Sequence, residues 1–555
     1  MIHFKYKFIV SFFVFLVLGN IVLAQSDPSA QKRITDTYVI TNVTLIPRPG
    51  VLLPNHDILI RDGQIVSVGK SLKRPAEAIQ ITGDSLFAYP GFIDMANKSG
   101  VKALSIPEKQ PDFDPSNPPD VQAGIHPQAD VLDLYDPTHS QVGDWRKNGF
   151  TISHKVPMGQ GMLPGTTGLV VYGPPESNTI IRKNVARYAK FSTIGGMYPA
   201  TNLGVMAKFR DLFENARLLS RHQITFASYQ GVKLPNEDPV LNSLIPVVQK
   251  SIPLFFEINS DLDVRRAINI QGEQGISMIL SGINEGGYLI TPIKESGAGV
   301  VLSINLPEEN KQDFSEEEPN LERKERLGKI NAAYIKKLEV AGEYEKAGIP
   351  FAFTTKHLAK DKFFDNIRLM RKHGLSDEGA LAALTVNPAK MLGIDNIAGE
   401  IASGKMANII LATDTLFTDD SQINYVIANG YVFEYPLKKS ASKNGKEGIS
   451  YWEYETRTGA GSANGFFEIS KKSGSPQGII SYQDPQDKGN ITSAMDNLKL
   501  SENRISFSFV VKTAREDLTI SVEGDVSGDT LDGKMRIADY ESLPFTATKT
   551  AKPEK

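Results

Sequence analysis

The chain has 555 residues, of which 41% are hydrophobic, with 61 Lys and Arg against 64 Asp and Glu, 8 His and no Cys. The absence of Cys excludes disulfides, thiol nucleophiles, Cys-based zinc sites and iron–sulfur clusters. A formal net charge of −3 provides no general attraction to nucleic acid or anionic lipid, so we expect no nucleic-acid partner. The length predicts about two to four domains.

Residues 1–24 have the pattern of a secretory signal peptide. Lys5 and Lys7 precede an almost wholly apolar run from Phe8 to Val22, and the small residue Ala24 follows. This pattern predicts cleavage after Ala24 and export to the periplasm or the medium, with no membrane attachment afterwards. An uncleaved membrane anchor is the alternative, because the apolar run is nearly long enough to span a bilayer.

Short β-type segments dominate residues 37–90. The run Arg61-Asp62-Gly63-Gln64 predicts a hairpin turn between two of them, and the whole region predicts a small antiparallel sheet. From residue 91 to residue 396, strand-like and helix-like segments alternate, which favours a parallel α/β barrel. The clearest predicted strands are 150–153, 252–258, 277–281, 299–305 and 350–354, and the clearest predicted helices are 261–275 and 330–347.

Two segments within this region have the composition of insertions. Pro107 to Pro137 is rich in Pro, Asp and Asn, and Pro307 to Arg326 is a dense run of mixed charge. Insertions that follow barrel strands commonly shape the mouth where ligands bind. The alternative for both segments is a solvated surface loop without a specific role.

Two predicted helices and then a run of predicted β-strands follow the α/β region. Ser376 to Glu378 predicts a helix start, and Asn387-Pro388 predicts a second one with Asn as the cap. Residues 397–436 are again β-like, so we expect them to join residues 37–90 in one sheet domain that the barrel interrupts. Residues 448–550 predict a separate antiparallel β domain, a sandwich or small barrel. Its acidic stretch Gly524 to Gly533 lacks the ligand order of a calcium loop and predicts two hairpin turns.

Four ordered motifs carry a resemblance to a known family. They are Tyr89-Pro90-Gly91-Phe92-Ile93-Asp94, residues 60–69, residues 374–393 and residues 399–408. Together they resemble the metal-dependent amidohydrolase superfamily, in particular secreted bacterial members. The resemblance implies an α/β fold with a (β/α)8-type barrel over residues 91–396 and a composite flanking β-sandwich of residues 37–90 and 397–436. It also implies hydrolysis of carbon–nitrogen bonds by water that zinc or another divalent metal activates.

The positions that the resemblance assigns to metal ligands hold other residues in this chain. The two histidines expected after the first strand are Ala96 and Lys98, and the acid expected after the last strand is Lys356. The histidine expected at the end of the middle strand falls at Glu257 or Asn259, and the next expected histidine falls at Ser281-Gly282. Alanine cannot ligate a metal, and a lysine ammonium repels a cation. We therefore expect the usual metal site to be degenerate, and we assign no cofactor.

Three other residues are candidates for chemistry at the barrel mouth. His154 and His357 follow predicted strands, and Glu257 could join them as a catalytic group or in a relocated metal site. The alternative is that both histidines are structural or merely exposed. The glycine-rich run from Pro157 to Val170 resembles a loop of the secreted branch, and its glycines allow close backbone approach to a ligand or to another loop.

Two functions remain open from the sequence. The first is a hydrolase acting on carbon–nitrogen bonds, of non-peptide or cyclic amide type, through a rearranged site. The second is a catalytically inactive amidohydrolase-fold protein that binds a small molecule at the barrel mouth or serves as the partner subunit of an active relative. Either could form homo-oligomers, and function has to be argued from the site itself.

Overall fold

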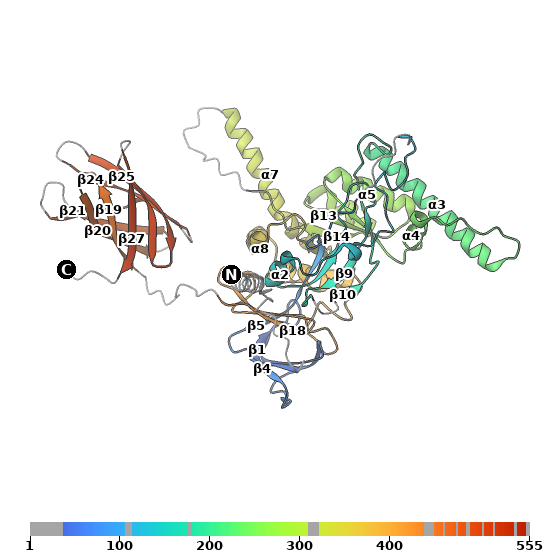
Figure 1. Cartoon of the computed structure of the whole chain (residues 1–555), viewed down its shortest axis with the longest axis horizontal. Coiled ribbons are helices and arrows are strands. Elements are labelled where there is room, and N and C mark those ends of the chain that lie inside the picture. The colour runs from blue at the N-terminus through green and yellow to red at the C-terminus, as the bar shows by residue number, and fades with distance from the viewer. Residues whose placement is uncertain are drawn as a thin grey trace, which may run out of the picture. The chain divides into compact units, whose positions relative to one another are not determined.

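A computed structural model describes residues 37–105, 114–175, 179–308, 321–437, 449–458, 461–472, 475–483, 489–501, 504–513, 517–537 and 541–550. The signal peptide, part of the first insertion and most of the second therefore lie outside the described residues. The chain divides into two compact units, one ending at Lys438 and the other beginning at Lys439 (Figure 1). No helix of the described residues is both long and apolar enough to cross a lipid bilayer.

Strands from both ends of the first unit join in one flanking sheet. They are β1 (Thr37–Leu45), β2 (Leu53–Arg61), β3 (Gln64–Gly69), β4 (Ile79–Thr82), β5 (Phe87–Pro90), β16 (Ile409–Ala412), β17 (Ile423–Ala428) and β18 (Tyr431–Glu434). Their order is β18-β17-β16-β5-β1-β2-β3, with β4 also paired to β1. Because β4 and β5 run parallel to β1, residues 37–90 do not form the wholly antiparallel sheet that was predicted. Ile410 pairs with Tyr89 where the two halves meet. As predicted, Asp62 and Gly63, both with positive φ, turn the chain between β2 and β3.

The barrel is built from strands that run mostly parallel. They are β6 (Phe92–Asn97), β7 (Phe150–Lys155), β11 (Arg187–Lys190), β12 (Leu254–Glu257), β13 (Met278–Ile283), β14 (Gly299–Ser303) and β15 (Phe351–Thr354). β15 also contacts β6, which closes the ring. Between β7 and β11 lies an antiparallel insertion, β8 (Gly165–Thr166) and β9 (Gly168–Val171), with β10 (Ile180–Arg182) at its edge. The predicted barrel fold is thus confirmed, with one stretch of its wall antiparallel.

Helices cover the outside of the barrel (Figure 1). They are α2 (Ser140–Lys147), α3 (Asn202–Ser228), α4 (Pro239–Val248), α5 (Asp261–Gln274), α6 (Ile290–Ser296), α7 (Leu321–Lys346), α8 (Phe363–Lys372), α9 (Asp377–Leu384) and α10 (Val386–Met391), with 3-10 turns η1 (Val131–Leu134), η2 (Gly287–Leu289) and η3 (Lys360–Lys362). The helix α5 has the predicted bounds, since Ser260 caps its start and Gly275 ends it in the left-handed conformation.

The start of α10 differs from the prediction. The helix begins at Val386 with Thr385 as the flanking residue, so Asn387 lies inside the helix instead of capping it. The amide of Asn387 instead donates a hydrogen bond of 2.8 Å to the carbonyl of Phe351 at the start of β15. A tertiary contact with the barrel has therefore replaced the local cap that the Asn-Pro pair suggested.

The second unit is a nine-stranded antiparallel sheet, which agrees with the predicted all-β fold. Its strands are β19 (Ile449–Thr458), β20 (Gly461–Lys472), β21 (Ser475–Gln483), β22 (Asn490–Ala494), β23 (Asp496–Ser501), β24 (Arg504–Lys512), β25 (Asp517–Ser527), β26 (Thr530–Ile537) and β27 (Glu541–Thr550). The order is β22-β21-β20-β19-β27-β26-β25-β24-β23. Because only Met495 separates β22 from β23, the two ends of this order are consecutive in the chain and the sheet curls closed around an aromatic core.

The acidic stretch of this sheet contains one hairpin turn, not the predicted two. β25 and β26 pair without a break from Ile520 to Ser527, and the chain turns at Gly528, which has a positive φ. Gly524 and Gly533 lie opposite each other within the ladder. A side chain on either glycine would collide with the facing backbone, so these glycines serve close strand pairing and not a second turn.

Candidate functional site at the barrel mouth

The carboxyl ends of four barrel strands bring charged side chains together. Lys98 follows β6, Lys190 ends β11, Glu257 ends β12, and Lys356 comes two residues after β15. The ends of parallel barrel strands all open at the same face, which is where barrels of this type hold their sites. The strands thus explain why residues up to 258 positions apart in the sequence meet there.

Lys356, Glu257 and Tyr188 form one connected network. The ammonium of Lys356 pairs with Oε1 of Glu257 and donates a hydrogen bond of 2.7 Å to the hydroxyl of Tyr188. That hydroxyl in turn donates to Oε2 of Glu257. The side chains of Lys356 and Glu257 are only 7% and 13% exposed. Both charges are therefore satisfied mainly by each other and by Tyr188.

The environment keeps this pair ionised at neutral pH. Burial lowers the pKa of Lys356 to about 8, against the attraction of Glu257. Burial opposes ionisation of Glu257, but the charge of Lys356 and the hydrogen bonds from Lys356 and Tyr188 bring the pKa of this carboxyl below its usual value. Burial and the charge of Glu257 raise the pKa of Tyr188 far above its usual range, so its hydroxyl stays protonated.

Further cations surround the pair. Lys190 donates a hydrogen bond of 2.6 Å to the carbonyl of Gly159, and burial followed by repulsion from Lys98 lowers its pKa against the attraction of Glu257. His357 is exposed and has a φ of 68°, and partial desolvation of its ring, with repulsion from Lys356 and Lys98, lowers its pKa. The charge of Lys98 acts on every member of this group.

A second polar network lies fully buried beside the mouth. Lys155, at the end of β7, donates hydrogen bonds of 3.1 Å to Oδ1 of Asn97, 2.9 Å to the carbonyl of Ser99 and 2.9 Å to the hydroxyl of Tyr172. Burial lowers the pKa of Lys155 to about 7, against the attraction of Asp94. The amide of Asn97 donates to Oδ2 of Asp94 at 3.0 Å.

The same network reaches the last strand through Thr355. Its backbone N–H donates to Asp94 at 3.1 Å and its hydroxyl also donates to this carboxylate. The amide of Asn97 donates to the hydroxyl of Thr355 at 3.0 Å. Burial raises the pKa of Asp94, opposed by these hydrogen bonds. The first and last strands of the barrel are thus locked together by polar side chains.

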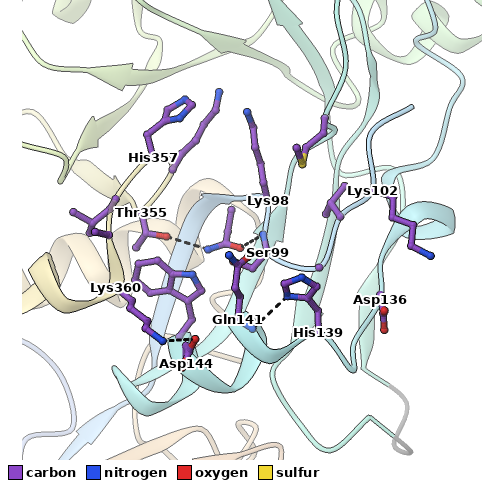
Figure 2. A pocket seen from close by; sticks show the side chains of 18 of the residues that line it. Lys98, Ser99, Lys102, Asp136, His139, Gln141, Asp144, Thr355, His357 and Lys360 are labelled. Carbon is purple, nitrogen blue, oxygen red and sulfur yellow. Dashed lines mark hydrogen bonds and ion pairs between the residues drawn. The ribbon is translucent and has the colours of Figure 1, made fainter. Parts of the chain in front are cut away.

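A cavity of about 760 Å³ opens above these networks. Lys98, Lys356 and His357 line it together with Asn97 and Thr355. Figure 2 shows Lys98 and His357 toward one end of this cavity and the ion pair of Asp144 and Lys360 toward the other. The cavity therefore gives a ligand access to Lys98 and Lys356.

The three predicted catalytic candidates are not brought together. Glu257 lies in the network, and His357 lines the cavity. His154 is completely buried, with its Nδ1 2.9 Å from the carbonyl of Met95 and its Nε2 2.6 Å from the hydroxyl of Thr167. It packs edge-on against Phe255, and burial lowers its pKa to about 4. His154 is thus a neutral core residue that does not line the cavity.

Four of the positions expected to have lost metal ligands, Ala96, Lys98, Asn259 and Lys356, also differ in location. Ala96 is completely buried, and its carbonyl accepts a hydrogen bond of 2.7 Å from Thr354. Asn259 is exposed just before the cap of α5 and does not line the cavity. Lys98 and Lys356 do line it. Of these four residues, only the two lysines therefore face the cavity.

These side chains do not fit a divalent metal ion. In the part of the chain that the structure describes, no three residues of His, Cys, Asp or Glu gather closely enough to hold one. The carboxylate at the mouth, Glu257, already accepts from Lys356 and Tyr188, so its oxygens are engaged. Metal-activated water requires neutral imidazoles or carboxylates as ligands, whereas the groups in contact with Glu257 are the ammonium of Lys356 and the hydroxyl of Tyr188.

The glycine-rich loop packs against the first insertion. Gly161 and Gly124 have positive φ values of 86° and 72°. A Cβ on Gly161 would lie 2.4 Å from the carbonyl oxygen of Gly124. Bridges from Ile125 to Leu163 and from Ala103 to Met158 continue this contact. The glycines therefore serve the approach of another loop, one of the two uses predicted for them, and the insertion contributes Asp136 to the cavity wall.

Sequence reasoning did not identify Tyr188, Lys190 or the Lys155 network. Strand β11 has only four residues, two of them Arg and Lys, so it lacks the apolar run that marks the other strands. The alternation of Tyr188 and Lys190 at a spacing of two residues is the signal that could have identified this strand and its inward face.

Comparisons with known proteins agree with this fold. Residues 265–433 match the model of the amidohydrolase family. An amidohydrolase from Thermotoga maritima has 20% identity and a TM-score of 0.58, over 72% of this chain and 100% of that one. A putative prolidase from Bifidobacterium longum has 14% identity and a TM-score of 0.42, over 74% and 97%. No curated protein matches the chain.

The β-aspartyl dipeptidase of Fervidobacterium islandicum is a further structural relative, with 13% identity and a TM-score of 0.36 over 74% of this chain and 100% of that one. Identities this low show the fold alone, and the family match covers residues 265–433. Residues 265–433 therefore resemble the amidohydrolase family, and the Thermotoga maritima amidohydrolase shows the same fold over 72% of this chain.

Proposed function

We propose that this protein binds a small molecule at the barrel mouth without a metal ion. The observation that carries the proposal is the network of Lys356, Glu257 and Tyr188, in which Lys356 holds the position where the superfamily resemblance expects an acid. An ion pair with two satisfied hydrogen bonds can hold the mouth together in place of a metal. The cavity next to it has a volume typical of ligand sites, about 300 to 1,000 Å³.

Metal analysis tests the proposal. The purified protein, expressed with zinc, manganese or iron supplied, should contain no more metal by elemental mass spectrometry than a metal-free control protein. A content of roughly one or two ions per chain, as in metallohydrolases, would refute the metal-free site. A panel of N-acyl amino acids, dipeptides and cyclic amides should also remain intact over long incubation with the protein.

The binding role has two forms that differ in the partner. The protein either acts alone, including as a homo-oligomer, or forms a hetero-oligomer with an active amidohydrolase. Co-expression with an amidohydrolase from the same genome, followed by affinity capture and light scattering, distinguishes the two. A complex of fixed stoichiometry supports the partner-subunit form, and recovery of this chain alone supports the first.

Metal-free hydrolysis of a carbon–nitrogen bond is the second candidate function. The family match and the ionised carboxylate of Glu257 beside the protonated hydroxyl of Tyr188 favour it. In this scheme Glu257 takes a proton from the attacking water, and Tyr188 or Lys356 donates one to the leaving nitrogen. Hydrolysis that Glu257→Gln abolishes, while the metal chelator EDTA leaves it unchanged, would establish this function.

Export is proposed from residues 1–24, which the structure does not describe. The Lys-flanked apolar run followed by Ala24 supports it. Expression of the full chain in a bacterial host, with cell fractionation and N-terminal sequencing, should give a soluble exported protein that begins at Gln25. A protein that keeps Met1 and sediments with the membrane would instead establish an uncleaved anchor.

A further inference from the structure

The lysines of the mouth outnumber the carboxylates that face them. Glu257, Lys98 and Lys190 all act electrostatically on Lys356. At the strand ends that the structure describes, the ammoniums of Lys98, Lys190 and Lys356 thus surround the carboxylate of Glu257. Lys190 satisfies part of its hydrogen bonding through the carbonyl of Gly159, but a carbonyl does not neutralise its charge. Uncompensated positive charge in a partly buried site favours an anion.

Three other acids line the cavity, Asp136, Asp144 and Asp361, and none of them forms a described ion pair with Lys98 or Lys356. Asp361 is exposed and lies between Lys360 and Lys362 in η3. Asp144 pairs with Lys360 at 2.7 Å, at the end of the cavity away from Lys98 (Figure 2). Asp136 accepts from the hydroxyl and backbone N–H of Thr138, and the ammonium of Lys102 helps these hydrogen bonds to lower its pKa. The positive group at the mouth thus stays unbalanced although acids line the same cavity.

The cavity offers an apolar wall as well as the lysines. Trp145 and Met158 line it, with Val101 and Leu358, which are 8% and 9% exposed. A volume of about 760 Å³ is far larger than the roughly 30 Å³ of one water molecule, so the space exceeds what a bare inorganic ion requires. A ligand that satisfies both features has an anionic head and an apolar body.

We infer that this cavity binds a small organic anion, with its carboxylate or phosphate at Lys98 and Lys356 and its apolar body against Trp145 and Met158. The inference rests on the proposed metal-free binding function and names the ligand class. Lys98 is the main anchor, since it is half-buried, lines the cavity and, unlike Lys356, has no ion pair with Glu257 within hydrogen-bond distance. A ligand carboxylate or phosphate oxygen would accept a charge-assisted hydrogen bond from its ammonium.

Tryptophan fluorescence can report binding directly. The chain has two tryptophans, and Trp452 belongs to the second unit, so a Trp452→Phe background leaves Trp145 as the only emitter. The probes are phenylacetate, phenyl phosphate and the neutral phenylacetamide. At least one anion should bind about ten-fold more tightly than the amide, the effect of one charge-assisted hydrogen bond. Its affinity should fall as salt is added.

Variants then locate the anion. Lys98→Gln should weaken binding of the preferred anion by about ten-fold and leave binding of phenylacetamide unchanged. Lys147→Gln, on the exposed end of α2 and outside the cavity, removes the same charge and should change neither. Circular dichroism confirms that both variants fold. The stronger of the two anions identifies the head group as carboxylate or phosphate.

The possible results distinguish a failure of the anion site from a failure of the proposed metal-free binding function. Equal affinity for the amide and both anions, or an unchanged affinity in Lys98→Gln, would overturn the anion site while metal-free ligand binding stands. No response to any of the three probes, in fluorescence and in titration calorimetry, would overturn the anion site as well. Metal found in the protein refutes the proposed function itself, whatever the probes do.

Discussion

Lys356 and Glu257 form an ion pair across the barrel mouth although the strands that carry them, β15 and β12, are separated by β13 and β14. Tyr188 on β11 completes the contact from the next strand beyond β12. The interaction therefore ties together parts of the wall that backbone pairing does not connect directly. It makes the mouth a fixed structural feature instead of an open ring of strand ends.

Loss of one partner of this pair should destabilise the first unit. Lys356→Met leaves the largely buried carboxylate of Glu257 without its main partner, and we expect a loss of about 3 to 5 kcal/mol in the free energy of unfolding. Urea unfolding followed by the emission of Trp145, in the Trp452→Phe background, measures it. The double variant Lys356→Met with Glu257→Gln should recover most of the loss, because no buried charge remains alone. A single-variant effect below about 1 kcal/mol would contradict the contact.

Lys155 should make the protein more stable as the pH rises above 7. Its pKa is about 7 in the folded protein but ordinary in the unfolded chain, so between these values only the unfolded chain holds the proton. Stability then rises with pH, by at most about 1.4 kcal/mol per pH unit for one proton. Relative to Lys155→Met, the wild type should gain stability from pH 7 to pH 9 in urea unfolding. A constant difference between the two proteins would show that Lys155 stays charged in the fold.

His154 should support the fold without taking part in ligand binding. His154→Leu leaves the carbonyl of Met95 and the hydroxyl of Thr167 without this partner and should cost about 1 to 3 kcal/mol. The folded pKa of about 4 lies below the ordinary value, so the stability that His154 contributes is present above pH 6.5 and lost as the pH falls toward 4. The difference between wild type and variant should therefore shrink over this window. If His154→Leu instead lost affinity for the preferred anion and kept its stability, His154 would be a ligand-binding residue.

A side chain at Gly161 should destabilise the protein, whereas a side chain at the exposed Gly272 should not. Gly161→Ala puts a Cβ 2.4 Å from the carbonyl oxygen of Gly124 and adds a residue with a φ of 86°, so we expect a loss of more than about 1 kcal/mol. Gly272→Ala, in the exposed part of α5 with no atom within 4 Å, should instead stabilise by about 0.5 to 1 kcal/mol. Thermal unfolding of both variants checks the opposite signs.

Local signals predicted the parts of the fold that local physics determines. The turn at Asp62 and Gly63 requires left-handed backbone, and the helix from Asp261 has its cap and its terminating glycine in the sequence. The four family motifs predicted the barrel and the sheet assembled from both of its flanks, which the family match and the strand order support.

Long-range contacts explain most of what the sequence could not predict. Asn97 and Thr355 are hydrogen-bonded partners 258 positions apart, and no local pattern relates them. The position of His154 along its strand predicts that it lies near the mouth. Successive strand residues point to opposite faces, however, so the side chain of His154 points into the packed interior and that of Lys155 joins the polar network. The position along a strand was thus predictable, and the direction and depth of the side chain were not.

The pairing of the first and last strands of the second unit determines how that unit could be joined to other chains. β19 and β27 are neighbours in the sheet, and Tyr451 near the start of one pairs with Thr550 at the end of the other. The chain therefore enters and leaves the sheet of the second unit at the same point of that unit's surface. Such a geometry lets a module be spliced into a surface loop of a host protein, or be circularly permuted, with little distortion of either part.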